Sequence, residues 1–217
     1  VRFAIAFVGL GEIYRIVMAL AVIESIGVTD QRELEDFWFH SYLSTLIAKD
    51  VAVHYLSYLP LDELWSAALL HDIGRLVYAR FFPEHLRAIR AYAQDQGCTL
   101  DSAESALELP SSALFGEGIC RHWGLPQRVR DACAHHHLVD LADMTQDGTL
   151  RGDFIRTVGI GHVLSEMCLE KLSDACQRDI TGQVMENLGC DEPAFLDLIA
   201  RVYACREEVN AFIRHML

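Results

Sequence analysis

Apolar residues recur along this chain with the period of an α-helix. In the stretch 33–58 seven residues lie near one face of the predicted helix, most of them three or four positions apart. They are Phe37, His40, Leu43, Ser44, Ile47, Val51 and His54. Such spacing is typical of a helix with one buried face. Alternating β-branched runs bounded by turns, which indicate strands, are missing. The pattern therefore predicts an all-α fold, a single helical bundle.

Prolines and glycines divide this pattern into separate helices, because proline begins helices and glycine ends them. The predicted helices cover residues 12–24, 33–58, 60–82, 83–96, 99–104, 110–123, 127–137, 154–172, 180–188 and 193–216. The stretch 138–153 holds several aspartates and two glycines, so we interpret it as a loop. Residues 154–217 then form a C-terminal helical subregion of one domain over 1–217 rather than an obvious second domain.

Composition narrows the class of protein. A chain of 217 residues can bury one substantial core. No apolar run reaches the roughly 20 residues that cross a bilayer, so we expect no membrane insertion. The net charge of −13 argues against a nucleic-acid surface, which needs clustered Lys and Arg. Seven scattered cysteines without a Cys-x-x-Cys motif indicate reduced thiols in a cytoplasm, with Cys120 and Cys133 as small core residues.

The most informative stretch is 69–75, which reads LLHDIGR. His71 offers an imidazole nitrogen and Asp72 a carboxylate oxygen at the end of an apolar run. The two can chelate one cation only if the backbone turns both toward it. Gly74 costs a helix about 1 kcal/mol relative to Ala, so it indicates close backbone packing or a bend. The alternative is a buried polar pair that bonds to its surroundings.

This stretch resembles the motif of the HD superfamily of metal-dependent phosphohydrolases. The strings LVY at 76–78, FFPE at 81–84 and WGLP at 123–126, with His136 and His137 after one short helix, are more similar to the HDOD family. HDOD domains are HD-related output domains of bacterial signalling proteins. The resemblance covers residues 10–140 and continues weakly to the end. The family normally has further helices upstream and the chain does not begin with Met, so we expect that an N-terminal part is missing.

The resemblance implies a set of metal ligands. The early histidine of the superfamily matches His40, and the His-Asp pair matches His71 and Asp72. Alone, His40 on an apolar face is more often a hydrogen-bonded core residue than a ligand. Two further positions depart from the pattern. The late aspartate is replaced by His162 in the string GIGHVL at 159–164, and the histidine expected before the tryptophan block is Ser112.

The three histidines at 135–137 allow two interpretations. They could stabilise the C-terminus of a helix when charged. One or both of His136 and His137 could instead line the pocket near His71, as the equivalent pair does in the family. A site of this kind would suit Fe, Mn, Zn or Ni, although losing an anionic ligand weakens it for hard cations. No catalytic residue and no other cofactor site can be assigned with these departures.

The resemblance also bears on function. The Gly-Tyr-Pro string of the cyclic-di-GMP phosphodiesterase relatives is missing. We therefore expect a bacterial, cytoplasmic regulatory output module that acts by protein–protein interaction and not by catalysis. Its partners would be signalling proteins, an attached sensory or receiver domain, or a second copy in a homodimer. Candidate surfaces are the helices over 12–24 and 195–212. The alternatives are a degenerate but active metal-dependent phosphohydrolase or phosphodiesterase, and a dimerisation scaffold.

Overall fold

Helices make up all the regular structure in the part of the chain that the computed structural model describes, residues 21, 23–144 and 148–216, which confirms the all-α prediction. The helices are α3 (Gln31–Tyr55), α4 (Leu61–Leu70), α5 (Gly74–Phe81), α6 (Pro83–Gln96), α7 (Leu100–Ala106), α8 (Ser112–His122), α9 (Gln127–Ala134), α10 (Leu138–Met144), α11 (Leu150–Leu169), α12 (Asp174–Leu188) and α13 (Glu192–Met216). Most of the predicted helix over 12–24 lies outside the described residues. Among the described helices, none combines the length and apolarity needed to cross a membrane.

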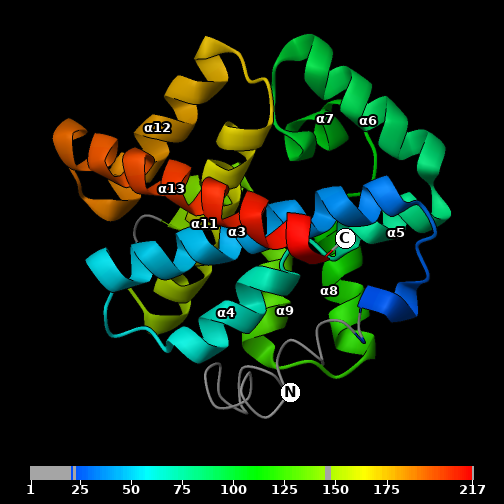
Figure 1. Cartoon of the computed structure of the whole chain (residues 1–217), viewed down its shortest axis with the longest axis horizontal. Helices are drawn as coiled ribbons and strands as arrows, with labels where there is room; N and C mark the ends of the chain where they lie inside the picture. The colour runs from blue at the N-terminus through cyan, green and yellow to red at the C-terminus, as the bar shows by residue number, and fades with distance from the viewer. Residues whose placement is uncertain (1–20, 22, 145–147, 217) are drawn as a thin grey trace.

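The long helix α3 lies at the centre of the bundle. It contacts α11, α4 and α13, and Figure 1 shows α13 crossing it in front while α11 passes behind. Asp30 caps its start by accepting a hydrogen bond of 3.0 Å from the backbone N–H of Arg32. Its contact with α11 is very close, because a Cβ atom added at Gly161 would lie 2.5 Å from the carbonyl oxygen of Ser44. Glycine at this position therefore lets the two backbones approach and brings the next residue of α11 against α3.

The predicted helix over 60–82 is wrong as one continuous helix, because the chain turns in its middle, whereas the bend or close packing predicted at Gly74 is confirmed. α4 ends at Leu70 and α5 begins at Gly74. Between them, Ile73 donates its N–H to the carbonyl of Leu70 and Arg75 to that of Asp72, at 3.1 and 3.0 Å. These bonds to the third preceding residue form a tighter turn than an α-helix. The turn ends where a Cβ atom at Gly74 would lie 1.8 Å from the carbonyl oxygen of Ser112 in α8.

The predicted loop over 138–153 is also wrong in part. Residues Leu138–Met144 form α10, and α11 already begins at Leu150. The Thr149 side chain caps α11 by accepting a hydrogen bond of 3.0 Å from the N–H of Gly152. Leu141 is buried under α11, so tertiary packing outweighs the polar composition of the stretch. The division into a core over 10–140 and a C-terminal subregion over 154–217 stays a prediction.

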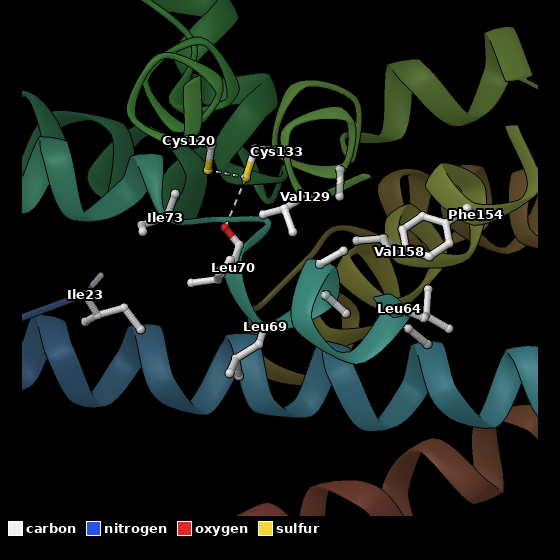
Figure 2. Packing of buried hydrophobic residues seen from close by; sticks show 14 of the residues in the cluster. Ile23, Leu64, Leu69, Leu70, Ile73, Cys120, Val129, Cys133, Phe154 and Val158 are labelled. Atoms are coloured by element: carbon white, nitrogen blue, oxygen red, sulfur yellow. Dashed lines mark hydrogen bonds between the residues drawn. The ribbon is translucent and has the colours of Figure 1, made fainter. Parts of the chain in front are cut away.

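Buried apolar side chains form three clusters. Figure 2 shows the first, where α4 packs on α3 and meets α8, α9 and α11. It contains Cys120 and Cys133, which are fully buried with their sulfur atoms 3.4 Å apart, and the Cys133 thiol lies 3.2 Å from the carbonyl oxygen of Leu70. Both cysteines are thus core residues and free thiols, as predicted. The last contact fixes the end of α4, immediately before His71.

Candidate metal centre

Four elements bring five polar side chains together in the interior. α3 supplies one, the turn between α4 and α5 two, the segment after α9 one, and α11 one. They are His40, His71, Asp72, His136 and His162, each at most 3% exposed. These residues are far apart in sequence, and the packing of α3, α4 and α11 on one another positions them.

The nitrogen atoms of three histidines form a small triangle. His40 Nε2 lies 3.3 Å from His71 Nε2, and both lie 3.0 Å from His162 Nδ1. Asp72 Oδ2 is 3.6 Å from His40 Nε2. Two ligands bonded at about 2.1 Å to one tetrahedral cation are about 3.4 Å apart. The four atoms, which all lie within 4.8 Å of one another, therefore have the spacing of a metal-ligand set.

Backbone carbonyls determine which nitrogen faces the centre in two of the histidines. His71 Nδ1 lies 2.6 Å from the carbonyl oxygen of Ala68, and His136 Nδ1 lies 3.0 Å from that of Ala132. A carbonyl only accepts, so each Nδ1 carries the proton and each Nε2 keeps its lone pair. His71 Nε2 belongs to the triangle, and His136 Nε2 lies 3.9 Å from Asp72 Oδ1. Both side chains thus present a metal-binding atom inward.

Burial keeps the histidines of the centre neutral. It lowers the pKa of His40, His136 and His162 well below 6.5, and the guanidinium of Arg75 lowers that of His40 further. Burial also lowers the pKa of His71 to about 4, against the attraction of Asp72. Neutral imidazole is the form that binds a metal, so the site is in its ligating state at neutral pH.

Two residues that sequence reasoning missed complete the electrostatics of the centre. Arg75 Nε lies 2.9 Å from Asp72 Oδ2, and Arg75 Nη2 lies 3.4 Å from Glu166 Oε1. Burial would lower the pKa of Arg75, but the two carboxylates outweigh it and raise that pKa. Glu166 Oε2 lies 3.6 Å from His162 Nε2, one helical turn along α11. In the sequence, the spacing of four residues between His162 and Glu166 places both on one face of a helix, and this was the signal that could have identified Glu166.

The donor atoms fit a divalent transition metal. Several buried atoms around the centre make no hydrogen bond within the described residues. At the centre itself they are Asp72 Oδ1 and Oδ2, the latter paired only with the charge of Arg75, and His136 Nε2. Buried polar atoms without a hydrogen bond are costly, and a cation bound at the centre would satisfy these atoms together. Imidazole nitrogens with one carboxylate suit Zn, Fe or Ni, so His40, His71, Asp72 and His162 would hold such an ion.

The other predicted residues differ in their distance from the triangle. His137 is 7% exposed, and its ring centroid lies 4.3 Å from that of His136 and 5.9 Å from that of His162, so it forms an outer layer. His135 is partly exposed, with its Nδ1 3.7 Å from Asp140 Oδ1. The metal-binding role of all these residues stays a prediction, whereas the close approach of most of them is a feature of the fold.

Ser112, which stands where the family often has a histidine, has a packing role here. Its N–H and its hydroxyl both donate to Glu104 Oε2, at 2.7 and 3.1 Å. Burial raises the pKa of the Glu104 carboxyl, and these hydrogen bonds oppose that shift. Because the Ser112 carbonyl also contacts Gly74, this residue joins α8 to the turn that carries His71 and Asp72.

A cavity of about 720 Å³ opens beside the centre, between the start of α3, α6, the end of α11 and α13. Its described lining includes His40 and Arg75 at the side of the centre, and Arg90, Lys171 and Arg206 around the cavity. His71, Asp72, His136 and His162 are not among those lining residues. The cavity therefore touches the triangle at one corner only.

Such a helical bundle with a His-Asp turn at a buried cluster of histidines defines an HD-like domain. The chain belongs to the HDOD family, whose domain model matches residues 1–139. No curated protein matches the chain significantly.

Three solved structures share the fold at low sequence identity. An HDOD domain protein of unknown function from Geobacter sulfurreducens has 19% identity and a TM-score of 0.70, over 100% of this chain and 74% of that one. A candidate phosphohydrolase from Shewanella amazonensis SB2B has 18% identity and a TM-score of 0.67, over 97% and 75%. A candidate signal transduction protein from Marinobacter aquaeolei VT8 has 19% identity and a TM-score of 0.62, over 83% and 39%. At this identity they support the fold alone.

Proposed function

We propose that this HDOD domain is a regulatory module of bacterial signal transduction, which acts by binding a partner, and that its centre holds a structural transition metal. The seven cysteines, all free thiols, are consistent with a reducing cytoplasm as its location. The Marinobacter protein of the same fold is named for signal transduction, which is in line with the proposal.

The argument against catalysis rests on the restricted access of substrate and water to the centre. A hydrolytic metal needs an open coordination position that substrate and water can reach. Here the side chain of Asp72 is 1% exposed, and Arg75 lies between this carboxylate and the cavity while pairing with Glu166 as well. A phosphoester in the cavity would meet Arg75 and His40 before any other group of the centre. A closed site of this kind is typical of a structural metal.

A partner could bind on the outer face of α13. Leu196 and Tyr203 are 59% and 51% exposed, and the half-buried Ile199 lies between them on the same face. Residues spaced by three, four and seven positions form one stripe on a helix. An exposed apolar stripe that charged residues surround has the composition of an interaction surface.

The proposal is tested by measuring hydrolysis and metal content together. The purified chain is loaded with Zn²⁺, Mn²⁺ or Fe²⁺, and the cleavage of bis(p-nitrophenyl) phosphate is followed beside Asp72→Ala protein. We expect a bound metal in the wild type and the same background rate in both proteins. A metal-dependent rate that disappears in Asp72→Ala protein would replace the proposal by the enzymatic alternative.

The binding surface is tested by capturing proteins from a bacterial lysate with wild-type chain and with Leu196→Asp/Tyr203→Asp protein. Val53→Asp protein serves as a control, since Val53 is also an exposed apolar residue but lies on α3. We expect a specific partner, or a second copy of the chain in light scattering, to be lost only from the α13 variant. Equal capture by all three proteins excludes this face.

The second candidate function is a metal-dependent phosphohydrolase. The observation in its favour is the triangle of His40, His71 and His162 with Asp72 beside it, which has the spacing of a metal site in the interior of an HD-like domain. The Shewanella structure is named for this activity. For turnover, the Arg75 side chain would have to leave Asp72. We therefore expect Arg75→Ala protein to show whatever hydrolysis the fold can support.

A further inference from the structure

His162 borders two different sets of donor atoms. Its Nδ1 faces the nitrogen atoms of His40 and His71 at 3.0 Å. Its Nε2 faces the other way, 3.6 Å from Glu166 Oε2. On that side Asp101, in the first turn of α7, joins the set. One ligand atom each from Asp101, His162 and Glu166 lie within 4.8 Å of one another.

The donor atoms of this second set lack hydrogen bonds. Asp101 Oδ1, His162 Nε2 and Glu166 Oε2 are buried atoms that no described residue bonds. His162 and Glu166 are each 1% exposed, so water outside the fold does not hydrate them. An imidazole nitrogen and two carboxylate oxygens that converge without partners have the arrangement expected of a cation site.

Charge favours a cation at the same place. The guanidinium of Arg75 pairs with Asp72 and with one oxygen of Glu166, whereas Asp101 lies beside Glu166 and His162 with no such pairing among the described ion pairs. The second oxygen of Glu166 and the Asp101 carboxyl therefore need a further positive group when both are ionised.

We propose that Asp101, His162 and Glu166 form a second cation site, which suits a hard divalent ion such as Mn²⁺. Two carboxylates and one imidazole favour oxygen-preferring ions, whereas the nitrogen-rich centre at His40 and His71 favours Zn²⁺ or Ni²⁺. This site goes beyond the proposed function, because it needs neither partner binding nor a metal at the first centre.

The two sites share His162 and therefore compete. A neutral imidazole has one protonated and one unprotonated nitrogen, so it offers a lone pair to one side at a time. A cation held by Nε2 places the proton on Nδ1, which then donates to His40 or His71. Thermodynamic linkage makes the effect reciprocal: Zn²⁺ at the first centre weakens Mn²⁺ binding, and Mn²⁺ weakens Zn²⁺ binding by the same factor.

The test is a titration of the metal-free chain with Mn²⁺, in which electron paramagnetic resonance measures the free ion. Asp101→Asn is the main variant, since Asp101 is only partly buried and the change keeps its shape. Asp95→Asn is the matched control on the exposed surface of α6. We expect Asp101→Asn to weaken Mn²⁺ binding by at least about tenfold and Asp95→Asn to leave it unchanged. Equal affinities in all three proteins overturn the site.

A second variant separates this site from the first centre. His40→Ala protein removes a nitrogen ligand of the first centre and no donor of the second. We expect it to lose Zn²⁺ affinity, measured against a chromophoric chelator, and to keep its Mn²⁺ affinity. If Mn²⁺ and Zn²⁺ are lost together in His40→Ala protein, with its helical circular dichroism intact, there is one site and the proposal is wrong. Unchanged Mn²⁺ affinity after saturation of the wild type with Zn²⁺ contradicts the sharing of His162.

Discussion

The same two helices build two very different interiors. On one side α3 and α11 contribute His40 and His162 to the polar centre. On the other side they contribute Leu43 and Ile160, both fully buried, to the apolar cluster that α12 and α13 complete. Figure 1 shows α13 lying across α3 on that side. One pair of packed helices thus supports both a site and the cluster that holds it in place.

The two interiors differ in how much their contribution to stability depends on pH and on bound ions. Burying apolar side chains is favourable at any pH and with any ion, at about 25 cal/mol per Å². The polar centre buries histidines that must stay neutral, and carboxylates with only Arg75 as a described cationic partner. Its contribution therefore depends on protons and, with the proposed metal, on that ion as well. We expect perturbations of the two regions to differ in this dependence.

The largest loss of stability should come from lowering the pH. The folded-state pKa of His71 is about 4, below its ordinary value of 6.5. A depressed folded-state pKa gives stability that is complete above pH 6.5 and is lost as the pH falls toward 4. For His71 alone the loss approaches about 3 kcal/mol, and His40, His136 and His162 shift in the same direction. Urea unfolding of metal-free protein between pH 7 and 4 measures it. A flat profile contradicts the neutral buried histidines.

Leu198→Ala should come next, on the apolar side. Leu198 in α13 is fully buried, and truncating such a leucine costs about 2–5 kcal/mol. We expect the same loss of unfolding free energy with metal or chelator and at pH 6 or 8, as urea unfolding would measure. A loss that changes with metal would show that the two regions are coupled.

Metal removal should have a somewhat smaller effect. A ligand that binds only the folded state stabilises it by about 2.7 kcal/mol at a hundred times its dissociation constant. We expect chelation to lower the thermal midpoint of wild-type protein by the shift that corresponds to this free energy. The thermal midpoint of His71→Asn protein should stay unchanged. Equal shifts in both proteins would place the metal elsewhere.

The smallest effect should come from removing an ion pair near the protein surface. Arg201 Nε lies 2.8 Å from Asp50 Oδ2, at the partly exposed edge of the apolar cluster. Partly exposed pairs contribute about 0–1 kcal/mol, so Arg201→Gln should change the unfolding free energy by no more than that. A larger loss in thermal or urea unfolding would mean that this edge depends on charge as the centre does.

Local patterns predicted much of the fold before any tertiary information. Helical periodicity, with capping residues such as Thr99 and the left-handed Gly97 after α6, was sufficient for most helices. Two boundaries were not predictable in this way. The turn at His71 depends on contact between Gly74 and α8, and α10 depends on burial under α11. In both cases a distant element outweighs local preference.

The sequence by itself determined the all-α class, most of the separate helices, and the choice of His40, His71 and Asp72 as candidate metal ligands. It could not determine their surroundings. Only the tertiary structure placed Arg75 between Asp72 and the cavity, and Glu166 and Asp101 beside the second nitrogen of His162. The reason is physical: periodicity reports which face of a helix is buried, whereas the distance between side chains on different helices depends on how closely the backbones pack. At Gly161 and Gly74 a hydrogen in place of a methyl group permits that close packing.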